Sequence, residues 1–325
     1  MDLVTLAMRI LFICPKFNGY ENLLIEEMWS LDFHVTFFPD KPPGFFYRLL
    51  SFFPSRIKDL LIKRYLHTII KCAENEDFDC VFVVKGTVLD PSFMVSLKNL
   101  LPNSKFLMYQ WDSSLAHNSY LSISKFFDEV FTFDRLDVLN NNFKYLPLFY
   151  SKHYASLKQT QVPDYDLVFV GEYYPDSDRL AIVKKIEKVA KREGLKFKFS
   201  LRADLFALIK FILYQQLSIS DIPYISIGRM SQESVVNIYS NSFAVLDIEH
   251  HQQNGLTMRT MEVLGAGLKL VTTNKNIYQE DFFNKERIMI IDREKPTLVK
   301  SFFQRTPLVP INTSYSIRSW LKLIL

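Results

Sequence analysis

The chain has 325 residues, which is long for one hydrophobic core and favours two domains of about 150 residues each. Hydrophobic residues make up 48% of the chain and charged residues 23%, and this balance excludes an intrinsically disordered protein. The net charge of +4 is too small to predict a nucleic-acid-binding face, but it suits anionic substrates such as nucleoside diphosphates, or an anionic membrane surface.

Short apolar runs alternate with helical patterns in the first half of the chain, which predicts βαβ units and a mostly parallel sheet. The expected strands are 9–14, a run around Val35, 79–84, 105–110, 129–134 and 144–150, and the expected helices include 22–31 and 91–100. The amphipathic segment 45–70 carries five lysines and arginines among Phe, Leu and Ile. Either it covers the sheet with its apolar face or it forms a patch that meets a membrane.

A polar stretch, 151–165, lacks a clear period, contains a proline and is interpreted as a linker. The strands expected after it are 166–171, 196–200, 224–228, 242–249, 269–273 and 287–292, and the expected helices are 178–193, 231–239 and 256–264. Gly194 is expected to end the helix 178–193. The apolar segment 204–214 leaves the same two interpretations open as 45–70.

These elements predict two doubly wound, Rossmann-like α/β domains that face each other across a cleft. The first is expected at 1–155 and the second at 156–310, with a helix at 311–325 for which packing back on the first domain is one option. In such sheets ligands bind outside the carboxyl ends of the strands, and the cleft between two domains is the expected site. The start of the chain lacks the basic region and the cleavage site of a signal peptide, and either Met1 or Met8 fits as the first residue.

Several common catalytic motifs do not occur in the sequence, namely the Walker A loop, G-x-G-x-x-G, H-E-x-x-H and G-x-S-x-G. Three Asp-x-Asp triplets, which begin at Asp77, Asp164 and Asp176, offer carboxylates to a divalent cation. Two of them precede strands and the third begins a helix, where acidic residues act as caps, so no metal site is expected. The three cysteines have no ligand-like spacing and are interpreted as reduced thiols of a cytosolic protein.

The most informative stretch runs from Asp247 to Ile277. It predicts a strand end, a polar loop and a helix that carries Arg259 and Glu262 on one face, because they are three residues apart. The start of this helix near Leu256 directs backbone N–H groups towards the strand ends, which suits a diphosphate. Arg259 adds a cation for phosphate oxygens, and Glu262 an acceptor for ribose hydroxyls. An exposed Arg259–Glu262 ion pair with no ligand is the alternative, and the spacing alone leaves both open.

This segment resembles the donor-binding region of GT-B glycosyltransferases, in particular the group-1-like and CgeB-like proteins of bacterial polysaccharide gene clusters. In those proteins a late helix Glu grips the ribose and a small-residue turn follows, and Glu262 and Gly265–Gly267 match them. FVGEYYPDSDR (169–179) is similar to the loop that faces the diphosphate, and IGRMSQESVVNIYSNS (227–242) to the segment beside the base. The first half of the chain resembles the same proteins in YQWDSS, FTFDRLD and YLPLFY. The residues expected to bind the donor, from their place in this segment or from the resemblance, are Gly171, Arg179, Arg229, Asn254, Gly255, Leu256, Thr257, Arg259 and Glu262.

One position departs from the pattern of that family. Many retaining members carry an acidic residue eight positions before the late Glu, and this chain has Asn254 there, which leaves the stereochemistry open. An inverting enzyme needs a general base. Asp112 is the first candidate because it follows the strand 105–110 and so lies at the ligand edge of its sheet, and His250 and Glu172 are the alternatives.

The resemblance implies transfer of a sugar from a nucleotide-sugar donor to a hydroxyl of a saccharide or lipid-linked acceptor, in bacterial surface polysaccharide or lipopolysaccharide assembly. Positive groups and helix N-termini can stabilise the leaving diphosphate, so neither a metal nor another cofactor is expected. No nucleic acid is expected as a partner. The expected location is cytoplasmic, with peripheral contact to the inner membrane left open. The alternatives are a nucleotide-sugar epimerase or a glycerol-phosphate transferase on the same scaffold, and a non-catalytic nucleotide-sugar-binding protein.

Overall fold

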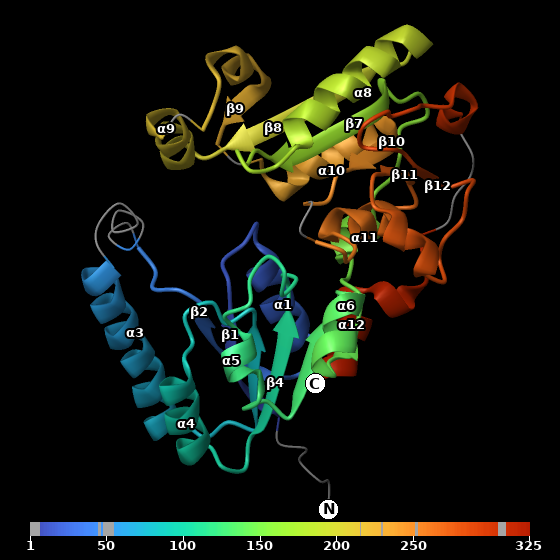
Figure 1. Ribbon diagram of the computed structural model, residues 1–325. Coiled ribbons are helices and arrows are strands. Elements are labelled where there is room, and N and C mark those ends of the chain that lie inside the picture. Colours follow the sequence, from blue (N-terminus) through green and yellow to red (C-terminus); the bar gives the residue numbers. More distant parts are fainter. Residues whose placement is uncertain are drawn as a thin grey trace, which may run out of the picture. The chain divides into compact units, whose positions relative to one another are not determined.

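The structure is a computed structural model that describes residues 7–44, 47, 55–214, 216–228, 230–250, 253–304 and 310–325 (Figure 1). The chain divides into two compact units. The first consists of Met1–Pro147 and Arg318–Leu325, and the second of Leu148–Ile317. Each unit is built on a parallel six-stranded sheet with helices beside it, which confirms the predicted fold of two doubly wound α/β domains.

The sheet of the first unit has the strand order β2-β1-β3-β4-β5-β6. Its strands are β1 (Arg9–Cys14), β2 (His34–Pro39), β3 (Cys80–Val84), β4 (Lys105–Gln110), β5 (Glu129–Thr132) and β6 (Lys144–Tyr145). The helices are α1 (Tyr20–Trp29), α3 (Ser55–Asn75), α4 (Pro91–Leu100), α5 (Leu121–Ser124), α6 (Arg135–Asn141) and α12 (Ile317–Ile324). The strands β1, β3 and β4 are buried along almost their whole length, because a central parallel strand is covered on both of its faces.

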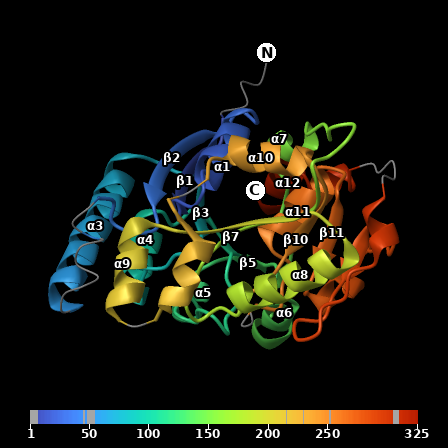
Figure 2. The same cartoon turned by 90° about the horizontal axis from the view of Figure 1, so that it is seen from above.

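The helix α3 lies beside α4 in Figures 1 and 2, and its second half belongs to the core of the first unit. Leu66 and Ile69 are buried there in one cluster with Phe93 and Leu97 of α4. This half of the helix therefore covers the sheet, as one of the two interpretations of the segment 45–70 states. Most residues that precede α3 in that segment lie outside the described part of the chain.

The C-terminal helix α12 packs on the sheet of the first unit. The indole ring of Trp320 is buried, and its centroid lies 4.6 Å from that of Tyr109 on β4 and 6.2 Å from that of Phe82 on β3. Arg318 donates a hydrogen bond of 2.9 Å to the carboxylate of Glu27 on α1. The last turns of the chain therefore complete the core of the unit that the first residues begin.

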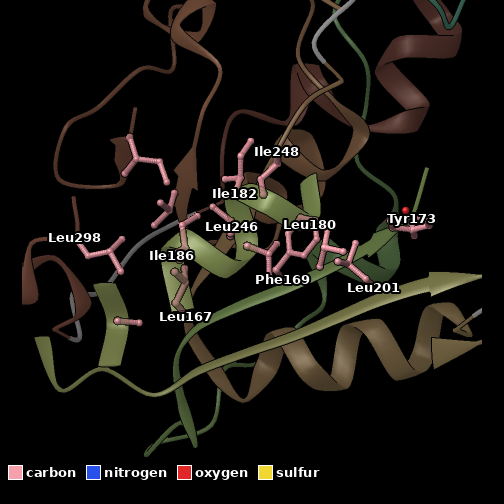
Figure 3. Packing of buried hydrophobic residues seen from close by; sticks show 14 of the residues in the cluster. Leu167, Phe169, Tyr173, Leu180, Ile182, Ile186, Leu201, Leu246, Ile248 and Leu298 are labelled. Carbon is pink, nitrogen blue, oxygen red and sulfur yellow. The ribbon is translucent and has the colours of Figure 1, made fainter. Parts of the chain in front are cut away.

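The sheet of the second unit has the strand order β12-β11-β10-β7-β8-β9. Its strands are β7 (Tyr165–Glu172), β8 (Phe197–Ala203), β9 (Ile225–Ile227), β10 (Ser242–Asp247), β11 (Lys269–Thr272) and β12 (Ile288–Ile290). Its helices are α7 (Lys152–Ala155), α8 (Arg179–Glu193), α9 (Leu205–Leu213), α10 (Gln232–Ser240) and α11 (Met258–Gly265). Figure 3 shows Leu180, Ile182 and Ile186 of α8 packed in one core with Phe169 and Leu246 of the sheet. The helix α8 ends as predicted, at the residue Gly194, whose φ is 69°.

Several strand predictions extend too far, among them 129–134, which ends as a strand at Thr132. The run 144–150 forms a strand only at Lys144–Tyr145, because Pro147 has no N–H group with which to continue the ladder. The run 242–249 leaves the ladder at Asp247, two residues early. The shorter β10 places the side chain of Asp247, rather than that of Glu249, at the end of the strand.

The stretch 151–165 was predicted to be a linker, and the structure corrects this. It contains α7, in which Tyr154 is buried, and the amide of Gln159 donates a hydrogen bond of 2.5 Å to the backbone oxygen of Ser242. One buried tyrosine among polar residues produces no periodic pattern, so the packed helix carries no signal in the sequence. The boundary between the units lies before this stretch, between Pro147 and Leu148.

The helix α9 has one buried and one exposed side. Leu208 belongs to the core of the second unit. The exposed residues of α9 are all apolar, and they are Leu205, Phe206, Ile209, Ile212 and Leu213. None of the helices in the described ranges is long and apolar enough to cross a membrane.

The last residue of α11, Gly265, is in close contact with an aromatic ring. A Cβ atom at this position would lie 2.3 Å from Cγ of Tyr150, which is well inside van der Waals contact. We expect Gly265→Ala to lower the free energy of unfolding by about 1–3 kcal/mol, the usual cost of overpacking a core. Urea unfolding of this variant, alone and with Tyr150→Ala, measures the effect. An equal cost of Gly265→Ala in both backgrounds would show that the ring is not the cause.

Candidate functional site

The carboxyl end of β10 is held by three side chains from the start of α11. Asp247, the last residue of β10, is fully buried. Its carboxylate accepts hydrogen bonds of 2.7 Å from the hydroxyls of Thr257 and Thr260, and one of 3.2 Å from Nη1 of Arg259. A buried carboxylate is tolerated only when its oxygens are bonded in this way. Asp247 therefore fixes the first turn of α11 at the ligand edge of the sheet.

Arg259 is held on three sides. Besides its bond to Asp247, its Nε donates to the hydroxyl of Tyr239 on α10 at 3.3 Å, and its guanidinium lies 5.2 Å from the centre of the Phe169 ring on β7. Burial opposes its charged form, but Tyr239 and Asp247 outweigh burial and raise the pKa of Arg259. Its side chain is 18% exposed. Arg259 is therefore a fixed cation with one accessible side.

Glu262 lies one turn further along α11 and is only 5% exposed. The alternative of an exposed Arg259–Glu262 ion pair is therefore wrong. Glu262 lies beside Tyr154 of α7, and burial together with this carboxylate raises the pKa of the tyrosine. The ring of Tyr154 is 6.1 Å from that of Tyr239. Arg259 and Glu262 thus belong to one cluster that is built from α7, α10, α11 and β10.

A second guanidinium reaches the same edge from the start of α8. Nε of Arg179 donates a hydrogen bond of 3.0 Å to the backbone oxygen of Ile248, the residue after Asp247, and its Nη1 donates to the backbone oxygen of Glu172 at 3.3 Å. Burial lowers the pKa of Arg179, and the charge of Arg259 lowers it further. Two cations therefore approach adjacent residues at the end of β10, beside the N-terminus of α11.

The donor-binding residues predicted at 254–257 belong to the loop between β10 and α11. The backbone oxygens of Asn254 and Gly255 accept hydrogen bonds of 2.8 and 3.0 Å from the side chains of Asn276 and Asn274. Leu256 is buried. The helix begins two residues later than predicted, because Thr257 is its N-cap and accepts a hydrogen bond from Thr260 N. Residues 254–257, which lead into α11, are thus held in place.

Gly171, near the end of β7, leaves room for the ring on which Arg259 rests. A Cβ atom here would lie 2.7 Å from the ring of Phe169. The next residue, Glu172, accepts a hydrogen bond from the hydroxyl of Tyr174. The lack of a side chain at Gly171 therefore makes room for the Phe169 ring. The carboxylate of Glu172 is held by the hydroxyl of Tyr174.

The remaining candidates are His250, Arg229 and Asp112. Nε2 of His250 is 3.7 Å from the carboxylate of Asp176, and Arg229 lies outside the described residues. Asp112 belongs to the first unit, where it follows β4 as predicted, and its carboxylate is paired with Lys85. The first unit thus carries one candidate base, and the cluster around Arg259 belongs to the second unit.

The carboxylates of the Asp-x-Asp triplets have structural partners. Asp79 accepts a hydrogen bond of 2.7 Å from Arg9 N, and Asp166 accepts one of the same length from Lys196 N. Asp178 forms an ion pair of 2.8 Å with Arg293, which also binds Glu249. Among the residues that the structure describes, no group of three or more His, Cys, Asp or Glu is placed to hold a metal ion.

Sequence reasoning missed three members of the cluster, which are Asp247, Tyr154 and Tyr239. Asp247 was placed inside the predicted strand rather than at its end. The two tyrosines contact residues that are distant in the sequence, and the spacing of residues along the chain does not indicate such contacts. The signal for Asp247 was present, since a polar residue that closes an apolar parallel strand lies at the ligand edge.

Comparison with known proteins places the fold. No model of a known family and no curated protein matches the sequence. Among solved structures, the UDP-GlcNAc 2-epimerase of Methanocaldococcus jannaschii is similar with a TM-score of 0.57 at 12% identity, covering 97% of this chain and 99% of that one. A glycosyltransferase of Rickettsia africae has a TM-score of 0.51 at 12% identity and 98% and 88% coverage. An Anabaena protein solved in complex with UDP and glucose has 0.51 at 11% identity and 97% and 98% coverage. These similarities show the GT-B fold.

Proposed function

We propose that the protein is a metal-independent glycosyltransferase that uses a nucleotide-sugar donor. The observation that carries this proposal is the approach of two guanidinium groups, Arg179 and Arg259, to the end of β10 beside the N-terminus of α11. Fixed cations and oriented N–H groups at strand ends are what a diphosphate requires. The GT-B fold, which the chain shares with proteins solved with UDP-sugars or UDP, supports the same function.

In this proposal the donor binds to the cluster of the second unit. The diphosphate lies against Arg179, Arg259 and the first turn of α11, and Glu262 accepts hydrogen bonds from the ribose. Asn254 is assigned to the sugar. The other donor-binding residues proposed are Gly171, Gly255, Leu256 and Thr257, which shape the loops around the phosphates, and Arg229, which lies outside the described residues.

The chemistry proposed is a displacement at the anomeric carbon. Asp112 takes the proton of the acceptor hydroxyl, whose oxygen forms a bond to the anomeric carbon. The bond from that carbon to the diphosphate oxygen breaks, and the nucleoside diphosphate leaves with its new charge beside Arg179 and Arg259. A bound metal is not needed for this step, because the two guanidinium groups supply positive charge. His250 and Glu172 are the alternative bases.

A nucleotide-sugar epimerase is the second candidate. It is supported by the similarity to the M. jannaschii epimerase and by a second titratable group near Asp112, since Nε2 of His117 lies 4.0 Å from its carboxylate. Epimerisation at C2 requires acidic and basic groups around the sugar, and this pair offers them.

Incubation with a panel of UDP-, GDP- and ADP-sugars, with and without saccharide acceptors, tests both candidates. Release of the nucleoside diphosphate together with a glycosylated or hydrolysed product supports the transferase. Interconversion of C2 epimers supports the epimerase. Binding of a donor without turnover would contradict both and leave a nucleotide-sugar-binding protein.

The acceptor is proposed to be a saccharide or lipid-linked hydroxyl of bacterial surface polysaccharide assembly, reached at an anionic membrane surface through α9. The exposed residues of α9 are apolar and its one charged residue is Lys210, which suits insertion among acidic headgroups. We expect the protein to sediment with phosphatidylglycerol vesicles, and Ile209→Ser with Ile212→Ser to reduce this at least several-fold. Leu115→Ser, at an exposed position of the first unit, is the control. Equal sedimentation of all variants would contradict a role for α9.

A further inference from the structure

The turn after β3 contains a lysine in an unusual backbone conformation. Lys85 has a φ of 71° and Gly86 one of 69°, and both lie in the left-handed region. Glycine adopts this conformation readily, but a lysine does so only when its surroundings hold it there. Strained residues of this kind concentrate at functional sites. The contacts that hold Lys85 in this conformation come from the end of β4.

The backbone of Lys85 is bound at both of its polar groups to the end of β4. Its N–H donates a hydrogen bond of 3.0 Å to the backbone oxygen of Tyr109, and its own backbone oxygen accepts one of 3.1 Å from Nε2 of Gln110. Gln110 is fully buried. Its side chain therefore offers Lys85 a hydrogen-bonding partner that is packed inside the protein. Asp112 follows two residues later. The same strand end thus fixes both Lys85 and Asp112.

The side chain of Lys85 forms an ion pair with the carboxylate of Asp112. Two other charged or titratable groups face that carboxylate. His117 approaches it to 4.0 Å from the loop after β4, and Lys41 lies nearby after β2. Burial lowers the pKa of Lys41, Asp40 acts against burial, and Lys85 lowers it further. Lys85 is thus the cation in direct contact with Asp112 within a compact group of charges at the ligand edge of the first sheet.

This ion pair differs from an ordinary surface pair of the same unit. The side chains of Lys85 and Asp112 are 25% and 18% exposed, whereas those of Lys98 and Asp128 are 35% and 48% exposed and lie 3.5 Å apart. Ion pairs between fully exposed side chains hold those side chains only weakly, whereas partly buried ion pairs hold them more firmly. Of these two ion pairs, the one at Asp112 also has a lysine with a left-handed backbone conformation.

We propose that Lys85 is a positioning residue that holds the carboxylate of Asp112 in the orientation in which it accepts the proton of the acceptor hydroxyl. This inference rests on the proposed function, in which Asp112 is the base. Lys85 itself touches neither donor nor acceptor in this role. Its backbone has a left-handed φ, and its ammonium group contacts Asp112, two residues after the end of β4.

Lys85→Gly is the most informative variant. It removes the ammonium group and at the same time places at φ 71° the residue that prefers this conformation, so the fold is expected to be kept. Using the donor that the wild type turns over in the panel, we expect kcat at neutral pH to fall about tenfold with little change in KM. Lys85→Arg should restore most of kcat, and Lys98→Met should match the wild type.

The outcomes separate this inference from the function on which it rests. A Lys85→Gly variant with a wild-type thermal midpoint and wild-type kcat overturns the role of Lys85 while the transferase assignment stands. A wild type that turns over no donor overturns the proposed function and the role of Lys85 together. A Lys85→Gly variant that loses kcat only in proportion to a loss of folded protein shows a purely structural lysine and also overturns the inference.

Discussion

Replacement of Arg259 by methionine is expected to weaken the binding of UDP about 10- to 100-fold, which is the usual effect of removing a charge-assisted hydrogen-bonding partner. The physical reason is that Asp247, Tyr239 and the Phe169 ring already hold the guanidinium in place, so little ordering is required on binding. Isothermal titration of UDP into the wild type and the variant measures the change.

The matched control for this experiment is Lys198→Met. Lys198 is an exposed residue of β8 in the same unit, and the substitution removes the same charge. The Arg259→Met variant should remain folded, since Thr257 and Thr260 still donate to Asp247. Equal affinities in the two variants would show that only the net charge of the unit attracts the nucleotide.

Replacement of Asp112 by asparagine is expected to reduce kcat about 10²- to 10⁴-fold, the range that a general base contributes. Asparagine keeps the shape of the side chain and cannot accept the proton of the acceptor hydroxyl. The affinity for UDP should stay at the wild-type value, because the proposed donor residues belong to the second unit. Turnover assays with the donor found in the panel, combined with UDP titration, separate the two effects.

Asp59→Asn serves as the control for that change, because Asp59 is an exposed residue of α3 in the same unit. It should leave kcat unchanged. If the Asp112→Asn variant keeps the wild-type kcat, the base is another group, and His250 and Glu172 become the residues to replace next.

The parallel sheets were predictable from the sequence, because continuous apolar runs such as RILFIC and DCVFVV have few alternatives to a buried strand. The end of α8 was predictable for a similar reason, since Gly194 adopts a left-handed φ at no steric cost. Contacts between segments that are distant in the sequence were not predictable. Tyr154 lies in a polar stretch without a period, and its burial depends on α10 and α11, which begin about eighty and a hundred residues later.

The candidate site was predictable in part. Helical spacing and the family resemblance brought Arg259 and Glu262 together on one helix, and the structure places both in one cluster. The partner of Arg259 could not be inferred, because Asp247 is twelve residues away and on another element. The left-handed conformation of Lys85 also leaves no trace in the sequence, since it is imposed by hydrogen bonds from β4.

A crystal structure of the protein with UDP bound tests the central claim most directly. The predicted result is a diphosphate within hydrogen-bonding distance of the guanidinium of Arg259 and of the backbone N–H groups in the first turn of α11, with a ribose hydroxyl on the carboxylate of Glu262. UDP bound away from the end of β10, with Arg259 in contact only with Asp247 and Tyr239, would contradict the assignment of this cluster as the donor site.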